Sequence, residues 1–134
     1  MSVQHINPDS LFRLDGFAQI SVPPAGKRLA FIAGQTALDK DFRLNADGFH
    51  DQVVAAFGNV VHALDALGAG TADIVSMTFY IVGLTDAKFQ DFVKAMNVAL
   101  DGGPFPANAS SVIGVERLAL AGLQIEMSTV VAID

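Results

Sequence analysis

The chain has 134 residues, of which 51% are apolar and only 16% are charged, and 14 acidic against 8 basic side chains give it a net charge of −6. It has no Cys, which excludes disulfides, thiolate metal sites and cysteine nucleophiles, and its few basic residues are scattered, which argues against a nucleic-acid surface. The low charged fraction indicates that some surface is buried against partner chains.

The same composition sets the expected organisation and location. Polar side chains interrupt the first 20 residues, and no apolar run reaches the roughly 18 residues that a membrane-spanning helix needs. We therefore expect a cytoplasmic protein with no membrane partner. A chain of this length is most simply one domain, residues 1–134, with an irregular lead-in over 1–14.

Strands dominate the first third of the chain. Residues 17–22 and 28–33 have the composition of strands, and the Pro-Pro-Ala-Gly turn between them predicts that they pair as a hairpin. A loop over 36–46 follows, with a short strand expected around 42–44.

A helix is expected next, over 48–67. Its apolar residues recur every three or four positions, which is typical of a helix with one buried face. Asp47 is the expected N-cap, and Gly68 stands where a C-terminal cap glycine belongs.

The second half alternates strands and helix. A strand is predicted over 73–83, a helix capped by Thr85 over 86–100, and two final strands over 110–116 and 123–132. The order ββ(β)αβαββ is α+β, with two helices covering one face of an antiparallel-rich mixed sheet.

Side-chain alternation along these strands predicts what lies on each sheet face. On the helix side we expect Val75, Met77, Phe79, Ile81, Ser111, Ile113, Val115, Leu123, Ile125 and Met127. On the opposite face we expect Ser76, Thr78, Tyr80, Ser110, Val112, Gly114, Gln124, Glu126 and Ser128. That second face carries small, uncharged polar side chains, which suits burial against another subunit better than exposure to water. We therefore expect a closed homo-oligomer with this face inward.

Several segments carry a family resemblance. The stretches "FIAGQTALD", "QVVAAFGNVVHALDALGAGTADIVSMTFYIVGL" and "FPANASSVIGVERLALAGLQIEMSTVVAI" occur in unbroken order from about residue 16 to 133. Together they resemble the Rid family, the YjgF-like reactive intermediate deaminases. The resemblance implies a chorismate-mutase-like α+β subunit and a homotrimer with small-molecule pockets at its subunit interfaces. It also implies hydrolysis of reactive enamines and imines to 2-keto acids and ammonia without a cofactor.

The resemblance also marks the positions of a site, where this chain departs from the family pattern. The Arg that binds the substrate carboxylate in the deaminases falls on Ser110, or on Asn108 with another gap placement. A Tyr of the family falls on Phe17, an Asn on Val93 and a Cys on Val112. Without the Arg we expect little or no activity on small 2-imino acids such as 2-iminopropanoate, because a guanidinium holds a carboxylate through two parallel hydrogen bonds.

Two family positions are kept, Glu126 in the last strand and Gly34 before Gln35. Glu126 is either a carboxylate that orients the attacking water or an interface glutamate paired with a neighbouring chain. Ser111 and Tyr80 are further candidates for the pocket lining. The histidine positions support neither a Ser–His pair nor a metal site, so no metal and no cofactor are expected.

Three functions remain open from the sequence. The first is an enamine or imine hydrolase that acts on a substrate other than small 2-imino acids. The second is a trimer that binds a small metabolite without catalysis. The third is the nuclease activity that an older family name suggests, and the acidic composition makes it the least compatible of the three.

Overall fold

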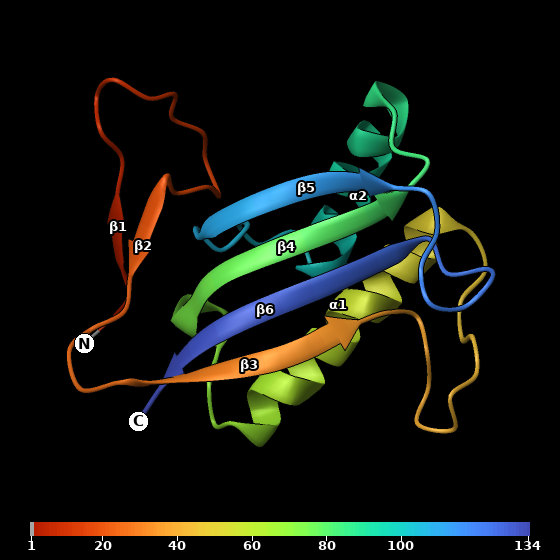
Figure 1. The fold of residues 1–134 in the computed structure, drawn as a ribbon, viewed down its shortest axis with the longest axis horizontal. Coiled ribbons are helices and arrows are strands. Elements are labelled where there is room, and N and C mark those ends of the chain that lie inside the picture. Colours follow the sequence, from red (N-terminus) through yellow and green to blue (C-terminus); the bar gives the residue numbers. More distant parts are fainter. Residues whose placement is uncertain (1) are drawn as a thin grey trace.

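The computed structural model describes residues 2–134 and confirms an α+β fold built on one mixed sheet. The sheet order is β3 (Arg28–Gln35), β6 (Ile125–Ile133), β4 (Ile74–Val82) and β5 (Ala109–Val115). Neighbouring strands are antiparallel except for the parallel pair β4–β5. Helices α1 (Phe49–Ala66) and α2 (Asp86–Ala99) lie together on one face, and the other face is bare (Figure 1).

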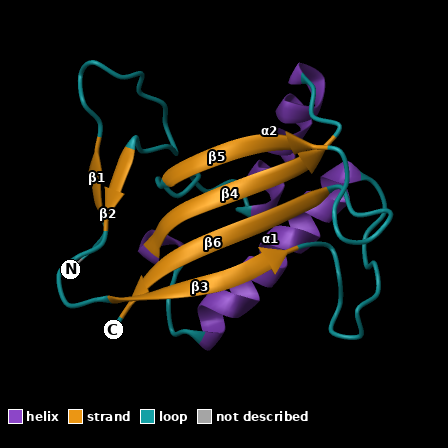
Figure 2. Cartoon of the chain, viewed as in Figure 1, coloured by secondary structure: helices purple, strands orange, loops and turns teal. Residues whose placement is uncertain are grey.

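The N-terminal region differs from the expected hairpin. Strand β2 (Ile20–Val22) pairs with β1 (Gln4–Ile6), inside the segment predicted to be irregular, and β3 pairs with β6. Residues 2–22 thus contain a two-stranded arm that stands beside the main sheet (Figure 2). The hairpin prediction was wrong because turn residues fix where a chain bends and leave open which strands pair.

Two of the three helix caps predicted from the sequence agree with the structure. Gly68 has a φ of 64° just beyond α1, as a C-terminal cap glycine requires. The hydroxyl of Thr85 accepts a hydrogen bond from the Lys88 amide at 3.1 Å and caps α2. The N-cap of α1 is Gly48, with no side-chain cap, so the prediction of Asp47 was one residue early.

The core fills the space between the sheet and the helices. The apolar stripes of both helices pack on buried side chains of β4 and β6. The largest buried side chains are Phe57, Phe79, Leu64, Ile74, Met77, Ile81, Met96, Ile125 and Met127. The short 3₁₀ turn η1 (Thr71–Asp73) leads from α1 into β4. No helix within residues 2–134 is long and apolar enough to cross a membrane.

A buried glutamine side chain connects helix α1 to the segment that leads into β6. The Gln52 side chain of α1 donates to the Gly122 carbonyl and accepts from the Gln124 amide, each at 2.8 Å. It is 1% exposed, so both hydrogen bonds are shielded from water. They hold the connection into β6 against α1.

The predicted sheet faces are correct for β6 and for most of β4, and reversed for β5. Met77 of β4 is buried on the helix side, as expected, and the parallel register places Ser110 of β5 beside it. Val112 likewise lies beside Phe79, which leaves Ser111 exposed on the other face. Apolar and polar residues alternate only weakly in the stretch "SSVIGV", so its sequence does not determine which side chains face the helices. The pairing of β5 with β4 determines this instead.

The start of β4 needs a smaller correction. The register with β6 shifts between Ile74 and Ser76, which is the signature of a bulge. Ile74 is therefore buried in the core, while Val75, expected there, is half-buried.

Candidate functional site

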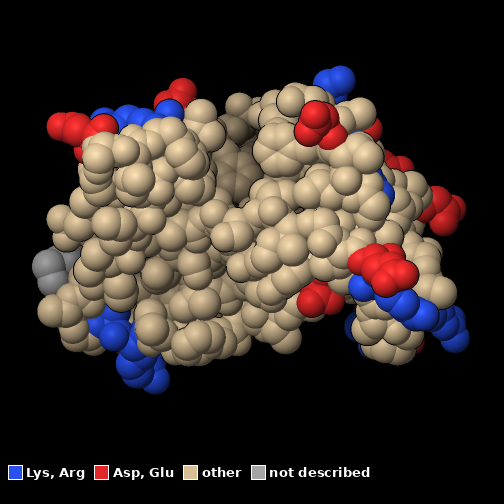
Figure 3. Space-filling model, turned by 45° about the horizontal axis from the view of Figure 1, so that its top comes forward, with Lys and Arg blue, Asp and Glu red and all other residues tan. Residues whose placement is uncertain are grey.

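An open cavity of about 690 Å³ lies between the arm, α2 and the edge strand β5. Four residues predicted for the pocket line it, namely Phe17, Val93, Ser110 and Val112. Figure 3 shows a hollow in the surface at this edge, with walls formed by uncharged residues. The structure thus brings together residues from three distant parts of the sequence.

Six of the twelve residues that line the cavity are phenylalanines. Phe79 lies with its ring centre 4.9 Å from that of Phe92 and 6.1 Å from that of Phe105, both edge to face. Phe89 extends the same row, 6.2 Å from Phe92. Edge-to-face and offset contacts at such distances are the favoured arrangements of aromatic pairs.

The opposite wall of the cavity comes from the arm. Phe12 stacks on Phe17 with ring centres 5.3 Å apart, and Leu14 lies next to them on the same loop. Sequence reasoning missed Phe12 and Leu14 because it assigned them to an irregular lead-in. Their signal was a group of large apolar residues in an otherwise polar segment.

The cavity wall carries no basic residue. Among residues 2–134, neither Lys nor Arg lines it, and Asp15 at its rim is its one charged residue. Arg13 stands between the cavity residues Phe12 and Leu14 in the sequence, and its guanidinium donates to the Asn7 carbonyl at 3.1 Å. Arg117 donates to the carbonyl of Leu118 at 3.1 Å. In the part of the chain that the structure describes, therefore, no guanidinium lines the cavity beside Ser110.

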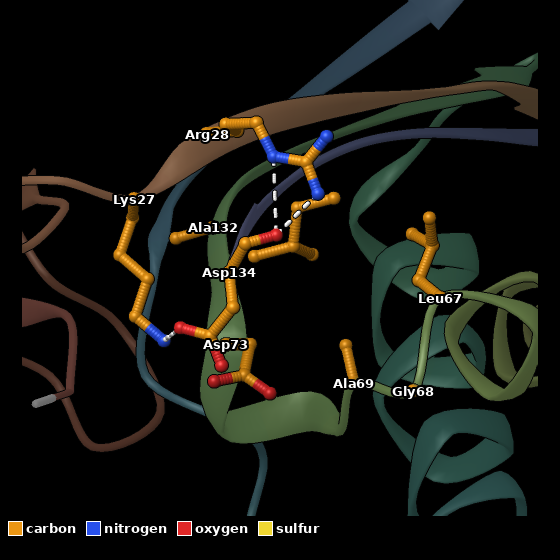
Figure 4. Close-up of a pocket in the computed structure, with 9 residues that line it drawn as sticks. Lys27, Arg28, Leu67, Gly68, Ala69, Asp73, Ala132 and Asp134 are labelled. Atoms are coloured by element: carbon orange, nitrogen blue, oxygen red, sulfur yellow. Dashed lines mark hydrogen bonds and ion pairs between the residues drawn. The ribbon is translucent and has the colours of Figure 1, made fainter.

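Arg28 is also engaged elsewhere. It borders a separate cavity of about 210 Å³ beside the end of α1, where both Arg28 and Lys27 turn toward Asp134 (Figure 4). Lys27 pairs with the Asp134 carboxylate at 2.6 Å, and Arg28 donates to its main-chain oxygen at 3.1 Å. The hydrogen bond from Lys27 holds the pKa of Asp134 below its usual range.

Glu126 lies on the bare face of the sheet, opposite Tyr80 in the β4–β6 register. The ladder between β3 and β6 shifts register between Ile32 and Gln35, and this irregularity brings Gly34 against the Glu126 carboxylate. A Cβ atom added to Gly34 would lie 2.3 Å from Glu126 Oε2, so the carboxylate would have to move away from its present position. The glycine therefore makes room for the carboxylate.

The predicted site residues thus form two groups on opposite faces of one sheet. The first group, which we call the aromatic cavity, includes Phe17, Val93, Ser110 and Val112. The second, which we call the carboxylate face, includes Gly34, Tyr80, Ser111 and Glu126. In one chain the sheet separates the two groups, so both can contact one ligand only if a second copy contributes.

Asn108 belongs to neither group. It is fully buried just before β5, donates to the Pro106 carbonyl at 2.9 Å, and accepts the Ala18 amide on its main-chain oxygen at 3.0 Å. The hydroxyl of Ser21 accepts the next amide, that of Ala109, at 3.0 Å. These contacts dock the arm on the start of β5 and so define one end of the cavity.

Metal ligation has no support in the described part of the chain, which contains no group of three or more His, Cys, Asp or Glu side chains able to share an ion. The two groups defined above offer an apolar cavity with the Ser110 hydroxyl and, on the other face, the Glu126 carboxylate.

This chain is similar to known proteins in sequence and in fold. A RutC family protein of Aquifex aeolicus is 30% identical over 106 residues, which cover 75% of this chain and 78% of that protein. The Yersinia pestis protein YyfB, of the conserved Rid family, has a crystal structure that matches with a TM-score of 0.84 at 27% identity over 99% of this chain and 100% of that one. The structure of Escherichia coli TdcF with bound serine shares the fold, with a TM-score of 0.64 at 21% identity over 83% of this chain and 84% of that one.

The family model described as "Endoribonuclease L-PSP" matches residues 16–133 and leaves the first 15 residues of the arm outside. Since that match spans most of the chain and the fold agrees with solved members, the chain belongs to the Rid/YjgF family, also called the endoribonuclease L-PSP family.

Proposed function

We propose that this protein is a cofactor-independent hydrolase of imines or enamines other than small 2-imino acids. The observation that carries the proposal is the aromatic cavity, which has Ser110 where the family resemblance expects a carboxylate-binding Arg and is lined by no cation. Losing one side of a buried, charged hydrogen-bond pair costs about 2–5 kcal/mol. A small anionic imine would therefore bind poorly, whereas an uncharged imine needs no such partner.

The proposed site is shared between two chains of a homotrimer. The bare sheet face carries exposed apolar side chains, among them Phe31 at 76% exposure, together with the half-buried Tyr80 and Glu126. An apolar face of this kind is buried when copies of the chain associate. With these faces turned inward, Glu126 of one copy lies at the interface with the next and can reach the aromatic cavity of its neighbour.

In the proposed reaction, Glu126 acts as a general base toward water. The Glu126 carboxylate takes a proton from the water while the water oxygen attacks the imine carbon. The carboxylate then gives that proton to the imine nitrogen, which forms the carbinolamine. The carboxylate then carries the hydroxyl proton of the resulting carbinolamine to nitrogen as the carbon–nitrogen bond breaks and the carbonyl forms, so one imine and one water give one carbonyl compound and one ammonia. An enamine first takes a proton on carbon to become the imine.

Ammonia release tests the proposal. Purified protein is supplied with uncharged imines and, in parallel, with 2-iminopropanoate, and the rate is compared with that of the Glu126→Gln variant. We expect release from an uncharged imine, little from 2-iminopropanoate, and a loss of about 10²–10⁴-fold in the variant, the usual contribution of a general base. Equal turnover by the variant would remove Glu126 from the mechanism.

The second candidate is a trimer that binds a small metabolite without turning it over. The separation of Ser110 from Glu126 by the sheet favours it, because a ligand in the aromatic cavity of one chain does not reach Glu126 of the same chain. TdcF, which has the same fold, was solved with bound serine. Calorimetric binding of a compound that is recovered unchanged, with no ammonia release from any imine tested, would select this candidate.

A further inference from the structure

We propose that the aromatic cavity selects an uncharged aromatic ligand and that the loop of the N-terminal arm, residues 7–19, is its specificity wall. The cavity is the one used in the proposed function, and the ligand class rests on that function in no other way.

The ring geometry is the first support. Phe79 and Phe92 are buried and form a floor, while Phe17 with Phe12 forms a facing wall on the arm. The volume of about 690 Å³ exceeds what a two- or three-carbon substrate fills. A flat ring placed between these walls removes apolar surface from water on both of its faces.

The polar groups of the cavity are the second support. Ser110 supplies one neutral hydroxyl, which can donate or accept one hydrogen bond. The Asp15 carboxylate at the rim repels anions and leaves a neutral head group unaffected. The cavity therefore fits an aromatic ring that carries one small uncharged group, such as an imine, carbonyl or amide.

The arm is built to hold its wall in place. Gln19 donates from its side chain to the Phe12 carbonyl at 2.9 Å, and its amide donates to Asn7 Oδ1 at 3.0 Å. Gly16, with a φ of 72°, approaches Phe105 so closely that an added Cβ would lie 2.7 Å from the Phe105 Cβ. These contacts hold the loop against the cavity that it lines. Phe12, Leu14 and Asp15 of this loop precede residues 16–133, the segment that matches the family model.

Three probes that differ in one property each test the ligand class. Phenylacetamide has the ring and a neutral head, phenylacetate has the same shape with a negative charge, and acetamide lacks the ring. We expect calorimetry or ligand-observed NMR on the full-length protein to detect phenylacetamide, to find phenylacetate at least about tenfold weaker, and to find no binding of acetamide. Phenylacetate binding as tightly as phenylacetamide, or acetamide binding as tightly, would overturn the proposal.

The arm is tested by three alanine variants in one loop. Phe12→Ala and Leu14→Ala remove cavity-lining side chains that are 62% and 61% exposed, so the fold itself should survive. Leu11→Ala removes a neighbouring side chain of 49% exposure that does not line the cavity, and it is the matched control. We expect each of the first two to weaken phenylacetamide binding by about tenfold and the control to leave it unchanged.

The outcome is separable from that of the proposed hydrolase. Binding of phenylacetamide by the unchanged protein with no ammonia release from any imine tested contradicts catalysis and leaves the ligand class intact. Absence of phenylacetamide binding contradicts the ligand class, and equal loss or no loss in all three alanine variants contradicts the role of the arm as the specificity wall. In that case turnover of an aliphatic imine would still uphold the hydrolase.

Discussion

At the scale of single residues, the position that the family resemblance assigns to a carboxylate-binding Arg holds Ser110. Ser110 points into a cavity walled by phenylalanine rings, and the position holds a neutral hydroxyl in place of a guanidinium. Glu126, which the pattern keeps, lies on the other face of the sheet beside Gly34. Under our proposal, this single difference changes which ligands the cavity accepts, while the fold agrees with that of solved family members.

Restoring the cation tests the importance of that position. In Ser110→Arg the guanidinium enters the cavity, and we expect ammonia release from 2-iminopropanoate to rise by at least about tenfold, since charge-assisted bidentate pairs are among the strongest hydrogen bonds. Ser111→Arg is the control, because it adds the same charge on the opposite face. Equal gains in both variants would show that charge alone is responsible.

The contact between Gly34 and Glu126 makes a second residue-scale prediction. Gly34→Ala pushes the carboxylate aside, because the new methyl group would lie 2.3 Å from Oε2. We expect ammonia release to fall nearly as far as in Glu126→Gln, measured with the same imine. Gly58→Ala in α1 is the control: its added methyl group meets nothing within 4 Å, and turnover should not change. Unchanged turnover in Gly34→Ala would show that the position of the carboxylate does not matter.

At the scale of elements, α2 and the arm define the cavity, and both are held by a few polar contacts. Thr85 fixes the start of α2, the helix that carries Phe89, Phe92 and Val93. The burial of the Lys88 ammonium, which donates to the Val82 carbonyl and lies over the Phe49 ring, lowers the pKa of that group. The arm depends instead on its contacts with the start of β5.

The cap of α2 should have a measurable effect on stability. Thr85→Ala leaves the Lys88 amide without its acceptor, and we expect the free energy of unfolding to fall by about 1 kcal/mol in chemical denaturation. Thr85→Ser keeps a hydroxyl at the cap and should lose much less. A loss of the same size in both variants would indicate that the threonine methyl group, and not the cap, is what stabilises α2.

At the scale of the whole molecule, one sheet face is covered by helices and the other is bare. The bare face combines exposed apolar side chains, such as Leu29, Phe31 and Ile113, with half-buried polar ones. A single chain would leave this face in water at a cost that association removes. Completion of the proposed active site and burial of this face therefore require the same assembly.

A charge placed on the bare face tests the assembly. Phe31→Asp would bury a carboxylate in the proposed interface, and we expect light scattering at micromolar concentration to give a trimer mass for the unchanged protein and a smaller mass for the variant. Val98→Asp, at an exposed position of α2, is the control and should remain a trimer. A monomer mass for the unchanged protein would contradict both the trimer and the shared site.

The sequence by itself determined both helices of this fold and most of its strands. Helical spacing over 48–67, the Thr85 cap and the cap glycine Gly68 are local signals, and each agrees with the structure because it depends on residues a few positions apart. That Ser110 stands where the resemblance expects an Arg can be read from the residues alone, and its effect on ligand choice is our proposal.

Only the tertiary structure decided how distant segments combine. Pairing of β2 with β1, and the parallel register that turns Ser110 toward the helices, depend on partners far away in the chain. The cavity wall at Phe12 likewise exists only because the arm docks on β5. A one-residue change of phase reverses every side chain of a strand, and weakly alternating segments such as "SSVIGV" leave that phase to the neighbouring strand.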